Sequence, residues 1–305
     1  MKGNILETIG SPLVEVSSPA GTTIAAKVES FNPGGSAKDR PARAMVEAAE
    51  AERALEPGDT IVEATSGNTG IGLAMVGAAK GYDVRLVMPE GRSAERQQIM
   101  RAYGADLELI DGTISDARDR VRDLASQSDY VEMKQFENPA NPDSHYRTAG
   151  PEILDQIGNR TVDALVAGIG TGGTISGVGR RLREEFPDLE IVGVEPAENA
   201  VLSGDPPGQD DYQGMGPGFV SENLDRELLD GVETVPLPEA EAECRRLARE
   251  EGIFVGQSSG GSNLAAKRVA RRLRDDGDGE EPFVITVFWD SGERYVSTGM
   301  FEDPE

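Results

Sequence analysis

One lysine of this sequence stands where its amine can react. Lys38 follows a turn over residues 33–35 (Pro-Gly-Gly), which interrupts the strand-like run 23–30. Ser36 is expected to cap a helix over residues 37–52, which would place Lys38 in the first turn. The positive end of a helix dipole disfavours an ammonium group and lowers its pKa. Lys38 is therefore a candidate nucleophile for an aldehyde, and an ordinary surface lysine is the simpler alternative.

Two glycine-rich segments each follow a predicted strand and open a predicted helix. Residues 168–174 (Gly-Ile-Gly-Thr-Gly-Gly-Thr) offer successive backbone N–H groups and two hydroxyls, which suits a phosphate. The same residues also fit a dinucleotide-binding fingerprint, with Glu195 at the sequence separation expected for a ribose contact. Residues 65–70 (Thr-Ser-Gly-Asn-Thr-Gly) carry three hydroxyls and an amide, which suit a small carboxylate better than a pyrophosphate.

Two further polar segments, residues 256–261 and 290–294, border a predicted helix and the end of an apolar strand. Ligands of α/β sheets bind outside the carboxyl ends of the strands, so we expect these loops and Lys38 to share one cleft. A nicotinamide cofactor would account for only one of the loops.

Strand and helix patterns alternate along the chain, which predicts an α/β fold with mostly parallel sheets and flanking helices. Residues 135–142 are expected to be a loop with two Asn-Pro turns, and residues 196–221 to be irregular. The strands are predicted at 60–64, 83–88, 106–110, 130–133, 162–167, 190–194, 232–236 and 283–288. The helices are predicted at 69–80, 93–103, 114–126, 144–156, 172–185, 239–251 and 262–274.

Composition limits the classes of partner. The 305 residues carry a formal charge of −25, which repels nucleic acid and anionic membranes, and the scattered acids suggest a halophilic source. The sequence shows neither a signal-peptide pattern nor an apolar run of membrane-spanning length, so we expect a cytoplasmic protein. The lone Cys244 excludes an internal disulfide and a cysteine-built metal site, and no metal is expected. We expect Cys244 to pack in a helix face and His145 to be structural.

Together these segments resemble the cysteine synthases (O-acetylserine sulfhydrylases), a family of fold-type II pyridoxal phosphate enzymes. The resemblance runs from residue 8 to residue 299. It covers, in the family's order and spacing, the segments 32–41, 65–70, 135–142, 170–174 and 291–295.

The resemblance implies two open sheets with the cofactor, pyridoxal 5′-phosphate, in the cleft between two domains. The smaller domain, residues 36–146, would carry a mobile substrate loop, and the larger, residues 1–35 with 147–305, would bind the cofactor. Lys38 would hold the cofactor as a Schiff base and act as catalytic base and acid. The implied cofactor-binding residues are Lys38, Asn68, Gly170, Thr171, Gly172, Gly173, Thr174 and Ser291, with Ser291 at the pyridine nitrogen. The implied substrate-binding residues are Thr65, Ser66, Asn68, Thr69 and Gln135.

The implied reaction is a β-replacement. O-acetyl-L-serine would lose acetate to leave an aminoacrylate, and sulfide would add to give L-cysteine. A serine at the ring nitrogen would leave the ring a moderate electron sink, which suits elimination. A homodimer is expected from the family.

Some residues depart from the family's pattern. Asp290 stands where many cysteine synthases have a second serine. Residues 100–105, 251–254 and 297–301 resemble the B-type isozymes, whereas residues 213–219 resemble the A type and offer no arginine for a phosphorylated serine.

Other activities remain open on the sequence. A cystathionine β-synthase-like enzyme or a serine/threonine dehydratase would have similar cofactor loops. An NAD-dependent oxidoreductase would use the loop at Gly168, and a non-catalytic binding protein would not need Lys38. The sequence leaves the sulfur donor and the salt dependence undetermined.

Overall fold

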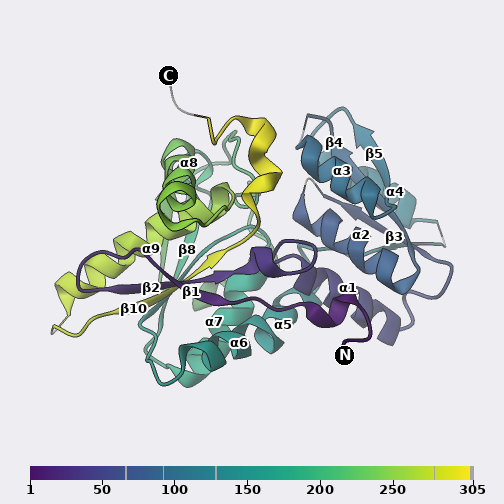
Figure 1. The fold of residues 1–305 in the computed structure, drawn as a ribbon. Coiled ribbons are helices and arrows are strands. Elements are labelled where there is room, and N and C mark those ends of the chain that lie inside the picture. The colour runs from purple at the N-terminus through teal and green to yellow at the C-terminus, as the bar shows by residue number, and fades with distance from the viewer. Residues whose placement is uncertain (66, 92, 128, 278, 303–305) are drawn as a thin grey trace.

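The chain forms two separate β-sheets, each covered by helices (Figure 1). The structure is a computed structural model, and it describes residues 1–65, 67–91, 93–127, 129–277 and 279–302. Two mostly parallel sheets with flanking helices confirm the fold class expected from the sequence.

The larger sheet has six strands in the order β1-β2-β10-β7-β8-β9, and only β1 runs antiparallel to its neighbour. Its central strand β10 is buried along its whole length, as expected for a parallel strand covered on both faces. The strands are β1 (Leu13–Val16), β2 (Thr23–Val28), β7 (Ala164–Gly168), β8 (Glu190–Pro196), β9 (Gly231–Val235) and β10 (Phe283–Phe288).

The smaller sheet has four parallel strands in the order β5-β4-β3-β6. Its strands follow β2 in sequence, and the chain then returns to the larger sheet at β7. They are β3 (Thr60–Ala64), β4 (Asp83–Pro89), β5 (Asp106–Ile110) and β6 (Tyr130–Glu132).

Helices cover both faces of each sheet. On the smaller sheet α1, α2 and α3 pack on one face and α4 on the other, and we call this unit the smaller lobe. On the larger sheet α8 and α9 pack on one face and α6 and α7 on the other, forming the larger lobe, while α5 contacts helices of both lobes. The helices are α1 (Asp39–Ala51), α2 (Asn68–Lys80), α3 (Ala94–Ala102), α4 (Ile114–Ala125), α5 (Ala140–Arg147), α6 (Ala149–Ile157), α7 (Gly173–Glu185), α8 (Leu237–Arg246) and α9 (Gln257–Asp276).

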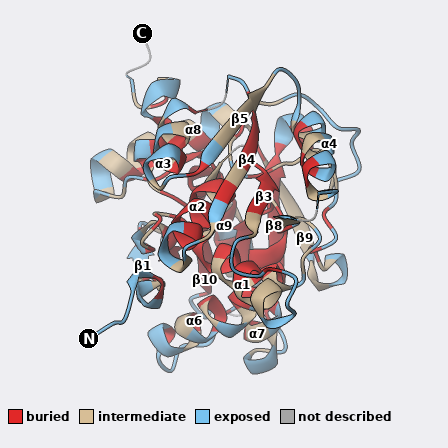
Figure 2. Ribbon diagram, turned by 90° about the vertical axis from the view of Figure 1, so that its right-hand side faces the viewer, coloured by how far each residue is buried: buried red, intermediate tan, exposed pale blue. Residues whose placement is uncertain are grey.

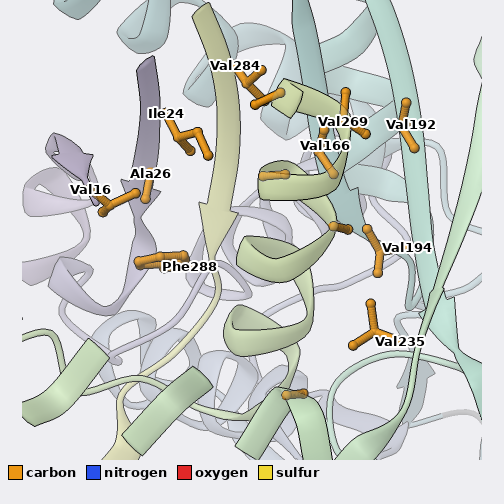
Figure 3. Close-up of a cluster of buried hydrophobic side chains, with 14 of the residues drawn as sticks. Val16, Ile24, Ala26, Val166, Val192, Val194, Val235, Val269, Val284 and Phe288 are labelled. Atoms are coloured by element: carbon orange, nitrogen blue, oxygen red, sulfur yellow. The ribbon is translucent and has the colours of Figure 1, made fainter. Parts of the chain in front are cut away.

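Apolar side chains between the strands and α9 form the largest core cluster. Val269 of α9 faces valines of the central strands, and Phe288 and Ile24 extend the cluster toward β1 (Figure 3). Buried residues are concentrated in the strands and on the helix faces turned toward them (Figure 2). Cys244 is part of this interior, as expected, since it is fully buried on α8.

Four features of the predicted elements are wrong. Asn141 and Pro142 lie inside α5 and not in a loop, and the single helix expected over 144–156 is split at Thr148 into α5 and α6. Residues 257–261 are the first turn of α9 and not a loop. Where one helix is expected over 239–251, the α-helix ends at Arg246 and a π-helical turn, Leu247–Glu251, follows it.

The division into domains at residues 36–146 stays a prediction. In the part of the chain that the structure describes, no helix combines the length and the apolar character needed to cross a membrane.

A buried ion cluster fixes α1 against the larger lobe. Arg40, whose side chain is fully buried, donates from Nε to Glu29 Oε2 at 2.8 Å and from Nη1 to Glu152 Oε1 at 2.7 Å. Lys27 Nζ adds a contact of 2.8 Å to Glu152. Removing one partner from such a cluster leaves the other charges buried without compensation.

We expect Arg40→Met to lower the free energy of unfolding by about 3–5 kcal/mol, because Glu29 would keep its charge in a site without water. Urea unfolding followed by circular dichroism measures this loss. The matched control is Arg122→Met, since Arg122 pairs with Asp119 at the surface with both side chains more than half exposed. The control should cost about 0.5 kcal/mol or less. Equal losses in the two variants would show that the buried cluster does not hold α1.

Candidate active site

A cavity of about 890 Å³ lies between the lobes, at the carboxyl ends of strands from both sheets. Thr65 and Asn68 follow β3, Gly170 and Thr171 follow β7, and Trp289 follows β10. The structure thus brings Lys38 to one cavity with residues of the predicted segments 65–70, 168–174 and 256–261, as the topology requires, whereas no residue of segment 290–294 lines it.

Lys38 lines this cavity directly before α1. The helix begins at Asp39, so Lys38 occupies the N-cap position and not the first turn, and Ser36 Oγ accepts a hydrogen bond from the Lys38 backbone at 3.2 Å. The glycine turn before it is held by Arg294, whose guanidinium donates to the carbonyls of Gly34 and Gly35.

The amine of Lys38 is poised to lose its proton near neutral pH. Burial lowers the pKa of Lys38 to about 8, against the opposing influence of the Asp290 carboxylate. The physical cause is removal from water, so the sequence-based explanation by the helix dipole is corrected here. The Nζ atom lies 5.9 Å from the centroid of the Trp289 ring.

The glycine-rich segment after β7 leaves no room for side chains. A Cβ on Gly170 would lie 2.8 Å from the carbonyl oxygen of Gly214, and one on Gly173 would lie 2.1 Å from Asn141 Oδ1. Gly172, in the left-handed region at φ 77°, is the N-cap of α7. Gly170 and Thr171 therefore present backbone at the cavity wall, with the N-terminus of α7 directly behind them.

Thr174 and His145 pack behind this cradle. The Oγ1 atom of Thr174 lies 3.1 Å from His145 Nε2, and both residues are buried. Burial lowers the pKa of His145 well below its usual range, and the charges of Arg40 and Lys38 act in the same direction. An uncharged histidine that contacts Thr174 fits the structural role expected for it.

The predicted carboxylate site is built around Gln135. Gln135 Oε1 accepts from Thr69 Oγ1 at 2.6 Å, and its Nε2 donates to the Ala64 carbonyl at 3.1 Å. Thr65 lies beside them, with its Oγ1 accepting from the Gly67 backbone at 3.2 Å. Thr65, Thr69 and Gln135 all line the cavity, whereas Ser66 lies outside the described residues.

Asn68, at the start of α2, faces both the cavity and Asp290. Its Nδ2 donates to Asp290 Oδ2 at 2.7 Å, and its Oδ1 has no hydrogen-bond partner among the residues that the structure describes. Asp290 is fully buried and also accepts from the Tyr295 hydroxyl at 2.9 Å.

The position of Ser291 at the pyridine nitrogen stays a prediction. Ser291 lies outside the cavity lining, and its Oγ accepts from the Glu293 backbone at 3.4 Å at the start of a 3₁₀-helix, Gly292–Thr298. The hydroxyl that lines the cavity on this side belongs to Ser258, in the first turn of α9. The sequence feature that pointed to Ser258 was its place in the polar segment 256–261. Trp289 could have been recognised as a lining residue because it is a lone tryptophan at the end of a predicted strand.

The structure does not support the dinucleotide interpretation, because Glu195 has another role. The carboxylate of Glu195 is buried and accepts from the backbone of Leu202 at 2.8 Å and of Ser203 at 2.8 Å. Glu195 therefore fixes its own loop, which leaves no reason to assign it to a ribose.

Comparison with known proteins places the chain in a family. Residues 6–288 match the family model described as pyridoxal-phosphate dependent enzyme. A cysteine synthase of Staphylococcus aureus is 47% identical over 304 residues, which are 98% of this chain and 96% of the relative. An O-ureido-L-serine synthase of Streptomyces lavendulae is 42% identical over 98% of this chain and 92% of its own length. The solved structure of an O-acetylserine sulfhydrylase isoform from Entamoeba histolytica has a TM-score of 0.93 at 39% identity, covering 100% of this chain and 93% of that one.

The residues of the cavity fit pyridoxal phosphate. An amine with a lowered pKa suits the aldehyde, and a glycine backbone that a Cβ would block suits the phosphate. Asn68, whose amide oxygen is buried and has no partner among the described residues, and Ser258 line the same cavity. Taken with the full-length match, this fit leads to one conclusion: the chain belongs to the cysteine synthase family of pyridoxal-phosphate-dependent enzymes.

Proposed function

We propose that the protein is a cysteine synthase that converts O-acetyl-L-serine and sulfide to L-cysteine and acetate. The observation that carries this proposal is the amine of Lys38, held with a pKa of about 8 in a cavity that residues of both lobes line. The 47% identity to a cysteine synthase over nearly the full chain supports the same activity.

The proposed roles follow from the cavity wall. Lys38 would hold the cofactor covalently, with its phosphate in the cradle of Gly170, Thr171, Gly172, Gly173 and Thr174. Bound pyridoxal phosphate supplies an electron sink for the pair left when the α-proton departs. Lys38 Nζ would accept that proton, since an amine whose pKa lies near the working pH can both take up and return a proton.

Thr65, Thr69 and Gln135, with Asn68, would bind the substrate carboxylate. Their hydroxyl and amide groups hold one another in place before any ligand arrives, which lowers the cost of ordering them. Ser66 is kept as a proposal from the resemblance. We propose that Ser258, and not Ser291, is the hydroxyl that faces the cofactor ring, because only Ser258 lines the cavity.

Contacts between the lobes would keep water away from the reacting groups. The α3 residue Arg96 donates to Gln213 Oε1, and Ser93 Oγ donates to the Arg294 carbonyl at 3.1 Å. Glu95 accepts from Ser297 Oγ at 2.8 Å. These bonds join the smaller lobe to the larger one across one edge of the cavity, and a closed edge protects a reactive intermediate from hydrolysis.

The location, the partners and the oligomeric state of the enzyme are proposed from its charge and its family. The formal charge of −25 supports a cytoplasm rich in salt, where repulsion among the carboxylates is screened, and argues against nucleic acid or membrane partners. A homodimer is proposed from the family alone.

The first prediction concerns the products. With O-acetylserine and sulfide the protein should release cysteine and acetate in equal amounts, measured by chromatography of the derivatised amino acid. Serine with homocysteine serves as the comparison, because a cystathionine β-synthase-like enzyme or a dehydratase would consume serine. If only serine reacts, the cysteine synthase assignment is wrong.

The second prediction concerns Lys38. Lys38→Ala should lower the rate of cysteine formation by about 10²–10⁴-fold, because the base that moves the α-proton is lost. Borohydride treatment of the wild-type protein should fix the cofactor to the peptide that contains Lys38, as read by mass spectrometry. Lys80→Ala is the control, since Lys80 pairs with Glu50 at 2.8 Å on the outside of the smaller lobe. Cofactor found on another lysine would contradict the assignment.

The third prediction concerns pH. Only the uncharged amine attacks the aldehyde, so the rate at which cofactor-free protein takes up pyridoxal phosphate should rise with pH and level off above about 8. At pH 7 about one amine in ten is uncharged, which sets the rate near a tenth of its plateau. Stopped-flow absorbance at a fixed cofactor concentration measures this profile. A rate that continues to climb toward pH 10 would show an unshifted lysine.

A further inference from the structure

Asp290 is a buried carboxylate directly behind two residues of the cavity wall, Asn68 and Trp289, and the proposed reaction leaves it without a role. It follows Trp289 at the end of β10 and is fully buried. Its Oδ2 receives Asn68 Nδ2 at 2.7 Å and the Tyr295 hydroxyl at 2.9 Å, and Arg96 Nη2 lies 3.5 Å away. These three partners come from α2, α3 and the segment after β10.

A carboxylate in this place determines which way the Asn68 amide points. An ionised carboxylate accepts hydrogen bonds and donates none, so the NH₂ group of the amide must face Asp290 and the amide cannot rotate by 180°. The NH₂ group keeps its second hydrogen for one further acceptor, and Asn68 is a residue of the cavity wall. A serine, by contrast, could accept from the NH₂ group or donate to the amide oxygen, and would leave the orientation open.

The carboxylate itself is held from several sides. A Cβ on Gly256 would lie 2.5 Å from Asp290 Oδ1 and 2.1 Å from Tyr295 Cε2, so backbone packs tightly against both groups. Arg96 lies over the Tyr295 ring, 4.8 Å from its centroid, and supplies a cation on the remaining side. These contacts therefore hold the Asp290 carboxylate in one orientation toward Asn68.

We propose that Asp290 is a positioning residue that fixes the Asn68 amide for the cofactor. The inference rests on the proposed function, because it takes Asn68 to contact the cofactor ring. It makes Asp290 act through Asn68 and not through contact with the reacting atoms.

A double-mutant cycle on cofactor affinity tests this role without measuring turnover. Cofactor-free Asp290→Ala, Asn68→Ala and the double variant are titrated with pyridoxal phosphate, and binding is followed by the emission of Trp289, the one tryptophan of the chain. Each single variant should bind about tenfold more weakly, the equivalent of one hydrogen bond to a charged group. The double variant should bind no more weakly than Asn68→Ala alone, because Asp290 has nothing left to position.

Asp290→Asn tests the same role by a conservative change. Its amide oxygen can still accept from Asn68 and Tyr295, so its affinity and the absorption maximum of the bound cofactor should lie between those of the wild type and Asp290→Ala. This variant keeps the shape of the side chain and gives the answer if Asp290→Ala does not fold. The matched control is Glu243→Gln, a buried carboxylate of α8 bonded to Arg246 and Lys267, which should bind the cofactor as the wild type does.

Three results overturn the inference: wild-type affinity in both Asp290 variants, losses that multiply to about a hundredfold in the double variant, or wild-type affinity in Asn68→Ala. A failure of the proposed function appears separately, as a wild-type holoprotein that binds the cofactor but makes no cysteine from O-acetylserine and sulfide.

Discussion

Removal of the Lys38 amine from water is the constraint on which this structure depends. An amine in bulk water keeps its proton up to about pH 10, and only burial brings its pKa to about 8. Arg40, two residues after Lys38, is also buried but keeps its charge. Arg40 is surrounded by Glu29, Glu152 and the hydroxyl of Ser11, so its charge is neutralised where it stands. These two basic residues, separated by one position, thus acquire different chemistry, because carboxylates surround Arg40 while Lys38 faces a cavity and the ring of Trp289.

The burial of Lys38 depends on both lobes. Neither lobe encloses Lys38 alone, because the cavity wall takes Asn68 and Thr69 from one lobe and Thr171 and Ser258 from the other. The smaller sheet is formed by a stretch of chain between β2 and β7, so α1 and α5 are the elements that connect it to the larger one. The ion cluster at Arg40 anchors the first of these connections, while the bonds from α3 close the opposite edge. A ligand in the cavity would therefore contact residues of both lobes.

The sequence predicts this site well wherever the signal is local. Alternating strands and helices, the lysine after a glycine turn and the glycine cradle all follow from residues close together in the chain. The errors share a physical origin in tertiary packing. Gly260 was taken as a loop residue, yet it lies in α9 where a Cβ would come 2.2 Å from the Ala240 carbonyl of α8, so the glycine serves helix contact. Pro142 was taken as a helix breaker, yet the first turn of a helix needs no N–H from it. The place of Ser258 at the cavity wall depends on how α9 packs against β10. This packing cannot be predicted from residues that are close together in the sequence.

Gly256 illustrates how such packing restricts variation. Its missing Cβ leaves the space that the ring of Tyr295 and the carboxylate of Asp290 occupy. A library that randomises position 256 alone will return only glycine among functional clones, since every alternative displaces an aromatic ring. Larger residues need room from both Tyr295 and Asp290, so position 256 cannot change alone. An engineer who wishes to place a side chain at position 256 should therefore change its neighbours at positions 290 and 295 as well, and a phylogeny of such enzymes should show these positions substituting in concert.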